Sequence, residues 1–90
     1  MHAALVSVTI APGQEDAARA ALHDQIVPRV KSAPGAVAGY WLEPRDGKGW
    51  STVIFETEEQ ARQTAPPAGS KPSDFVTVDY VEFREVVESF

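Results

Sequence analysis

The chain has 90 residues, of which 43% are hydrophobic and 23% charged, and it contains no cysteine. This length fits one domain over residues 1–90, and the missing cysteine excludes disulfides, a thiolate nucleophile and sulfur-ligated metal sites. The net charge of −5 comes from residues 46–90, which hold nine acidic and four basic side chains, because residues 1–45 hold four of each. Neither half offers the basic face that nucleic-acid binding needs. No apolar run reaches the roughly 20 residues that span a bilayer and nothing resembles a signal peptide, so a cytoplasmic protein is expected.

The first predicted element is a strand over residues 3–10, a segment rich in β-branched residues. Its odd positions are mixed in polarity, whereas its even positions are uniformly apolar: Ala4, Val6, Val8 and Ile10. Because successive strand residues point to opposite faces, the even face is expected to meet helices and the odd face a less dry environment.

A helix is predicted over residues 14–31, after the turn at Pro12 and Gly13. Its apolar positions recur at every fourth residue: Ala18, Leu22, Ile26 and Val30. This spacing predicts a single apolar stripe, so the helix should lie on a sheet. Pro28 lacks a backbone N–H and is expected to bend or loosen the last turn.

Two strands are predicted over residues 36–43 and 50–56, joined by a polar, glycine-containing connection that is typical of a hairpin. A short second helix over residues 58–65 follows, with Thr57 as its N-cap and Gln60 at the third helical position. Residues 64–74 contain three prolines and no large apolar side chain, which predicts a mobile loop.

The last predicted element is a strand over residues 75–87, in which two sets of side chains alternate. One face is expected to carry Phe75, Thr77, Asp79, Val81 and Phe83, and the other Val76, Val78, Tyr80, Glu82 and Arg84. The order β-α-β-β-α-β predicts an α+β domain of the ferredoxin-like type with a four-stranded antiparallel sheet. Both helices would cover one face, and the aromatic side chains of the bare face would need a cover, most simply a second copy of the chain.

Three local sequences strengthen this prediction. They are Thr9-Ile-Ala-Pro-Gly13 after the first strand, Ser32-Ala-Pro-Gly-Ala-Val-Ala-Gly-Tyr-Trp41 leading into the second, and Val53-Ile-Phe-Glu-Thr-Glu-Glu59 after the third. With the element order, they resemble the dimeric α/β-barrel superfamily, specifically antibiotic-biosynthesis-monooxygenase-like domains, over essentially the whole chain. The resemblance implies a homodimer packed sheet to sheet into a barrel, with a pocket in each protomer between sheet and helices.

Some proteins of that superfamily oxidise polycyclic aromatic substrates without metal or flavin, others degrade haem, and many have no assigned activity. On this resemblance, Val6 takes the place of the strand-one Asn of the haem-degrading proteins, and the second helix of this chain carries no His. The resemblance therefore implies neither haem nor any other cofactor.

The candidate ligand-binding residues are apolar or aromatic side chains on the predicted strands: Leu5, Trp41, Trp50, Phe55 and Phe83. Trp41 and Trp50 flank the hairpin on neighbouring strands and could form an aromatic wall that stacks a planar ligand. The more ordinary interpretation places both in the sheet-to-sheet interface of the dimer. Strand alternation puts Tyr40 on the face opposite Trp41.

Three titratable side chains are candidates for catalysis: His23, Asp79 and Tyr80. His23 lies on the flank of the helical stripe and would act as a proton shuttle only if it reached the pocket. Asp79 has apolar neighbours, and burial would raise its pKa and make it a base, whereas at the sheet edge it would pair or point outward. Tyr80 could supply a hydroxyl to the pocket or to a polar rim. No metal-ligand set emerges from the acidic residues and the two histidines.

Two functions from different classes remain. The first is a dimeric module that binds a small apolar or aromatic molecule between sheet and helices. The second is a cofactor-independent monooxygenase for an aromatic substrate, which would need a base, a donor that stabilises an oxyanion, and a dry pocket. A non-catalytic accessory or oligomerisation module is a third alternative, so whether the chain is an enzyme stays open.

Overall fold

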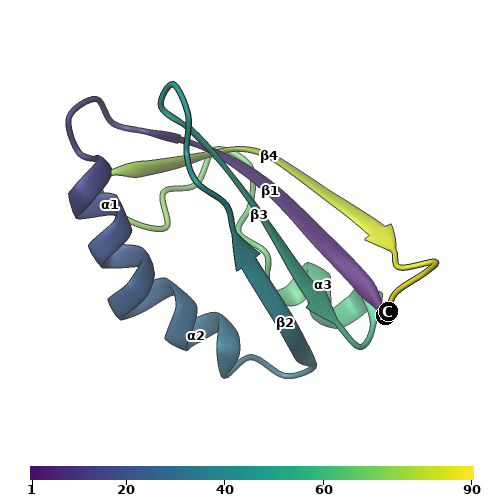
Figure 1. Ribbon diagram of the computed structural model, residues 1–90. Helices are drawn as coiled ribbons and strands as arrows, with labels where there is room; N and C mark the ends of the chain where they lie inside the picture. Colours follow the sequence, from purple (N-terminus) through teal and green to yellow (C-terminus); the bar gives the residue numbers. More distant parts are fainter.

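The computed structural model covers all 90 residues and confirms the predicted order of strands and helices (Figure 1). The elements are β1 (His2–Ile10), α1 (Glu15–Ala21), η1 (Leu22–Ile26), α2 (Val27–Lys31), β2 (Ala36–Trp41), β3 (Lys48–Phe55), α3 (Glu58–Thr64) and β4 (Val76–Glu85). The four strands form one sheet in the order β2-β3-β1-β4, and every neighbouring pair is antiparallel. This α+β architecture is compatible with a ferredoxin-like fold. No helix is long and apolar enough to pass through a bilayer.

Both helical segments pack on one face of the sheet, which we call the covered face. The even positions of β1 point to it, as predicted, and Ala4, Val6 and Ile10 are buried there. The odd positions point to the opposite face, which we call the open face. On this face Ser7 of β1 lies between Trp50 of β3 and Tyr80 of β4, its two partners in the register.

The hydrophobic core occupies one end of the covered face, beneath α3 and the end of α2. Its centre consists of Ala4 of β1, Val53 and Phe55 of β3 and Ala61 of α3. Phe55 is 1% exposed and fills the space between sheet and helices. Partly buried apolar side chains surround this centre: Val30, Ala33, Ala36, Trp41, Ala65 and Phe83.

The alternation predicted for the last strand is wrong beyond its middle, because β4 contains a bulge. Val78 pairs with Val8 but Tyr80 pairs with Ser7, so Asp79 is an extra residue without a partner on β1. A bulge of this kind reverses the faces to which the following side chains point. Val78 therefore lies on the covered face together with Val81 and Phe83, and it is almost fully buried.

The segments α1, η1 and α2 form one continuous helix over residues 15–31 with a π-helical turn in its middle (Figure 1). The backbone N–H of Val27 bonds to the carbonyl of Leu22, five residues back. In a regular α-helix the ring of Pro28 would press on the carbonyl four residues before it, and the wider turn relieves this clash. The irregularity expected from Pro28 thus falls in the turn before it.

The second helix begins as predicted, since the hydroxyl of Thr57 accepts a bond from the N–H of Gln60 at 3.2 Å. The proline-rich connection after α3 contains no helix or strand, also as predicted. Two backbone bonds tie it to β4, from Gly69 N–H to the Val78 carbonyl at 2.7 Å and from Val78 N–H to the Ser70 carbonyl at 2.8 Å.

Candidate functional site

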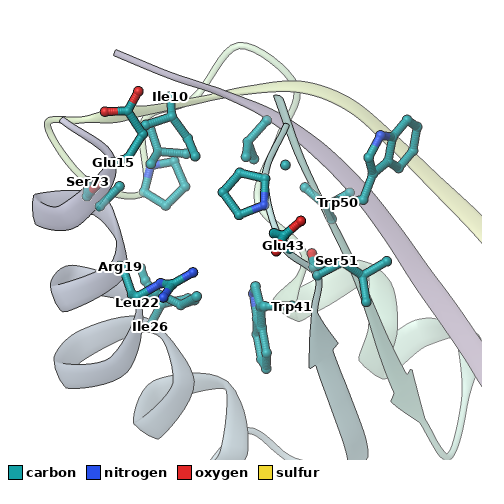
Figure 2. Close-up of a pocket in the computed structure, with 18 of the residues that line it drawn as sticks. Ile10, Glu15, Arg19, Leu22, Ile26, Trp41, Glu43, Trp50, Ser51 and Ser73 are labelled. Atoms are coloured by element: carbon teal, nitrogen blue, oxygen red, sulfur yellow. The ribbon is translucent and has the colours of Figure 1, made fainter. Parts of the chain in front are cut away.

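A cavity of about 490 Å³ separates the first half of the long helix from the covered face of the sheet (Figure 2). Its volume lies in the range of small-molecule sites, roughly 300–1,000 Å³. The helix contributes Ala18, Leu22 and Ile26 to one wall. The opposite wall comes from the sheet and includes Val6, Val8, Ile10 and Trp41. The predicted apolar stripe of the helix and the even positions of β1 thus face each other across the cavity, and their side chains do not fill it.

The strand β3 presents small residues to this cavity. Gly49 and Ser51 face the helix here, whereas Val53 and Phe55 occupy the equivalent positions farther along the same strand. Gly49 is fixed by its neighbour, because a Cβ at this position would lie 3.1 Å from a methyl carbon of Val8. One strand therefore supplies large side chains to the core at one end and small ones to this cavity at the other.

Trp41 stands at the centre of the hollow region. Its indole extends into the space between helix and sheet, opposite Leu22 and Ile26 (Figure 2). The ring lies over Gly39, where an added Cβ would come within 2.8 Å of the indole carbon Cζ3. Tyr40 points to the open face and is 60% exposed. The predicted separation of Tyr40 from Trp41 is confirmed.

A second cavity of about 500 Å³ lies on the core side of Trp41. The two cavities have five lining residues in common: Val6, Ile26, Trp41, Ser51 and Pro72. We refer to both together as the groove, which follows the long helix and is bordered on its far side by the proline-rich connection. An elongated molecule lying in the groove would contact Trp41 near its middle.

The charged groups of the first cavity are few and belong to exposed side chains. The guanidinium of Arg19 projects into the cavity (Figure 2) and has no acidic partner within ion-pair distance. Glu43 is held by Arg45, whose Nε lies 3.3 Å from its carboxylate. Glu15 and Asp16 complete the charged lining. These groups can orient a polar substituent of a ligand whose body is apolar.

Three of the five predicted ligand-binding residues line the groove. Trp41 lines both cavities, Phe55 forms part of the wall of the second, and Trp50 contributes to the edge of the first. The indole of Trp50 points away from the cavity (Figure 2) and is 52% exposed. Leu5 and Phe83 line neither cavity, because Leu5 points to the open face and Phe83 packs against the core.

The two tryptophans do not form one aromatic wall. Trp41 pairs with Ser51 across the hairpin, so Trp50 is offset by one residue and points to the other face. This places Trp41 in the groove and Trp50 on the open face, next to Tyr80. Trp41 therefore lies between helix and sheet, whereas Trp50 lies on the face that the helices leave uncovered.

None of the candidate catalytic side chains lines either cavity. His23 is exposed on the outer side of the helix, with its Nδ1 3.1 Å from a carboxylate oxygen of Asp24. Asp79 is the bulge residue of β4 and is exposed. Its carboxylate accepts a bond of 2.5 Å from the hydroxyl of Thr9 and lies 3.5 Å from the ammonium of Lys48.

Tyr80 is on the open face, where its hydroxyl donates a bond of 2.5 Å to the carboxylate of Glu82. This bond and the negative charge of Glu82 raise the pKa of Tyr80. The pKa of Glu82 is lowered, chiefly by its hydrogen bond from Arg84. A tyrosine held in its neutral form can donate a hydrogen bond but is a poor base at neutral pH.

Several residues that line the groove were not predicted from the sequence. Arg19 belongs to the same helical stripe as Leu22 and Ile26, so its position three residues before Leu22 was an available signal. The connection after α3 lines the second cavity through Pro66, Pro67 and Lys71, although its composition indicated only a loop. No group of three or more His, Asp or Glu side chains is arranged to hold a metal ion.

Comparison of the chain with family models, curated proteins and solved structures finds no match.

Proposed function

We propose that this protein binds a small apolar or aromatic molecule in the groove between its long helix and its sheet. The observation that carries the proposal is the cavity around Trp41, bounded by apolar side chains of the helix and of β1. An indole face offers a stacking surface for a planar group, and the few charged groups belong to exposed side chains. This is the kind of pocket that the resemblance to antibiotic-biosynthesis-monooxygenase-like domains leads us to expect.

We propose further that two copies pair through their open faces, as the dimeric α/β-barrel resemblance implies. Three aromatic side chains support this, because Tyr40, Trp50 and Tyr80 are 60%, 52% and 48% exposed on that face. Side chains of this kind are enriched in protein interfaces. A stable interface buries about 800 Å² on each partner, which the face of a four-stranded sheet can supply.

A cofactor-independent monooxygenase is the alternative within the same groove. Such an enzyme needs a base within hydrogen-bond reach of the substrate. His23, Asp79 and Tyr80 line neither cavity, and the carboxylates that do line the first are the exposed Glu15, Asp16 and Glu43. A binding role accounts for the geometry without an assigned base and is therefore the preferred proposal.

The binding proposal is tested by the two tryptophans, which provide one reporter on each face. The indole N–H resonances of Trp41 and Trp50 are assigned with the variants Trp41→Phe and Trp50→Phe. The neutral probe N-phenyl-1-naphthylamine is then titrated into the labelled protein. The expected result is a saturable shift of the Trp41 resonance with little change at Trp50. Absence of a shift at Trp41, or a larger shift at Trp50, contradicts binding in the groove.

The dimer is tested by light scattering at micromolar concentration, where a mass near twice 9.7 kDa is expected. The variant Trp50→Lys places a charge on the open face and should reduce the mass to that of one chain. The control Val87→Lys changes a residue beyond β4 that is also exposed and should leave the mass unchanged. A wild-type mass near 9.7 kDa would contradict the dimer while leaving the groove proposal intact.

A further inference from the structure

The two halves of the groove differ in charge. The first cavity is lined by three acidic side chains and one basic side chain: Glu15, Asp16, Glu43 and Arg19. The second is lined by Arg29 and Lys71 and by no acidic residue. The chain as a whole carries a net charge of −5, so a cationic end of the groove stands out against an acidic background.

The two cations of the second cavity are not used within the fold. Neither Arg29 nor Lys71 lies within ion-pair distance of an acidic side chain, whereas Arg45, Arg62 and Arg84 all do. They come from different elements, since Arg29 is on α2 and Lys71 is in the connection after α3. Both are exposed side chains that line the second cavity, so this half of the groove carries two positive charges without an acidic partner.

The separation of the two ends sets the length of a matching ligand. The helix rises about 1.5 Å per residue, so Glu15 and Arg29 stand roughly 20 Å apart along its axis. Between them the groove is lined by Leu22, Ile26 and Trp41. A molecule that fills both cavities and places a polar group beside Arg29 and Lys71 must therefore be elongated and apolar over most of its length.

We propose that the natural ligand is an elongated carboxylic acid, with its apolar body across Trp41 and its carboxylate at the end formed by Arg29 and Lys71. The inference rests on the proposed binding function and adds the head group and the orientation. The reverse orientation would place the carboxylate beside Glu15, Asp16 and Glu43, where like charges repel it. Arg19 is the only cation in that half of the groove.

The test compares pairs of probes that differ only in charge. Pyrenebutanoic acid and its primary amide represent an aromatic body, and 11-(dansylamino)undecanoic acid and its primary amide represent an aliphatic chain. Binding is measured in low salt by quenching of Trp41, with Trp50→Phe as the background in every protein. Each acid is expected to bind about fivefold tighter than its amide, because two exposed ion pairs contribute modestly. The preference should shrink in high salt.

A matched pair of variants assigns the preference to the groove. Arg29→Gln and Lys31→Gln remove one positive charge each from the last turn of the same helix, and only Arg29 lines the groove. The ratio of acid affinity to amide affinity should fall to about its square root in Arg29→Gln, because one of the two positive charges remains. The ratio should fall to about one when Lys71→Gln is added. It should be unchanged in Lys31→Gln. Binding of the amides to Lys31→Gln, whose residue lines neither cavity, should stay within twofold of the parent protein.

The outcomes separate this inference from the function on which it rests. Acids and amides that bind equally well overturn the carboxylate proposal but leave the groove as a binding site. A preference that survives in Arg29→Gln/Lys71→Gln also overturns it, and loss of that preference in Arg19→Gln would indicate the reverse orientation. Failure of all four probes to reach Trp41 contradicts the proposed function itself. The pair that binds tighter shows whether the body is aromatic or aliphatic.

Discussion

The two ends of the covered face are built from the same strands yet differ in how they are filled. At one end Val53 and Phe55 of β3 pack with Ala61 of α3 in the hydrophobic core, and the second cavity lies beside them. At the other end Gly49 and Ser51 face the long helix, and a cavity of about 490 Å³ remains. The difference shows how a chain of 90 residues can separate its stability from the first cavity of its candidate site. The large side chains of β3 pack in the core and stabilise the fold, and its small side chains leave room for the first cavity.

The largest expected effect on stability comes from removing a large side chain from the core end of the covered face. Phe55→Ala removes a side chain that is 1% exposed and should lower the free energy of unfolding by about 3–5 kcal/mol. The counterpart at the hollow end, Ser51→Ala, should change it by less than about 1 kcal/mol. Urea denaturation of both variants measures the contrast. Similar losses in the two variants would contradict the proposed separation of stability from the site.

The reverse change fills the hollow end. Ser51→Leu places an apolar side chain between the two cavities and should abolish binding of N-phenyl-1-naphthylamine, because the space that accepts the probe is occupied. The matched control Thr52→Leu makes nearly the same change one residue later, on the open face. Fluorescence titration should show binding to the control and not to Ser51→Leu. Unchanged binding to Ser51→Leu would contradict a site in the groove.

A smaller effect is expected from moving the residue that stands between the two ends. Gly39→Ala adds a Cβ that would lie 2.8 Å from an indole carbon of Trp41, so the ring must shift. Probe affinity should fall by about tenfold, with a loss of about 1–3 kcal/mol in unfolding free energy from overpacking. The control Ala38→Ser alters a neighbouring strand position away from the indole. An unchanged indole resonance in Gly39→Ala would contradict the expected displacement of Trp41.

The smallest effect concerns the helix that covers the filled end. The hydrogen bond and charge of Arg62 lower the pKa of Glu58, so the carboxylate is stabilised in the folded state. A lowered folded-state pKa contributes stability above the unfolded-state value, and this contribution is lost as the pH falls through the folded-state pKa. Wild type should therefore exceed Glu58→Gln in urea midpoint at pH 7, with the gap narrowing toward pH 3. Glu59→Gln serves as the neighbouring control, and a gap that widens in acid would contradict the mechanism.

The sequence predicted the elements well where a strong local pattern exists. The even apolar positions of β1, the fourfold spacing from Ala18 to Val30 and the cap at Thr57 each depend on neighbouring residues alone. The bulge at Asp79 could not be predicted from alternation, because one unpaired residue looks like an ordinary strand position until the partner strand is known. The grouping of Val78 on one face with Tyr80, Glu82 and Arg84 was therefore wrong.

The candidate site was less predictable because it depends on register and on distance. Trp41 and Trp50 point to different faces only because Trp41 pairs with Ser51, and one residue more or less in the hairpin would reverse that result. The first cavity depends on the distance between Gly49 and the long helix, and no local sequence pattern predicts that distance. Arg29 and Lys71 meet at one cavity although 42 positions separate them in the chain, a proximity that only the folded structure reveals.

The backbone bonds between the proline-rich connection and β4 have a consequence for how the sheet meets other chains. β4 is an edge strand, and unpaired edges are templates on which a foreign strand can add. Both the N–H and the carbonyl of Val78 are occupied by the connection, and Pro66, Pro67 and Pro72 within it have no N–H to offer. The segment that borders the groove therefore also covers this edge at Val78, so a foreign strand cannot pair with β4 at that position.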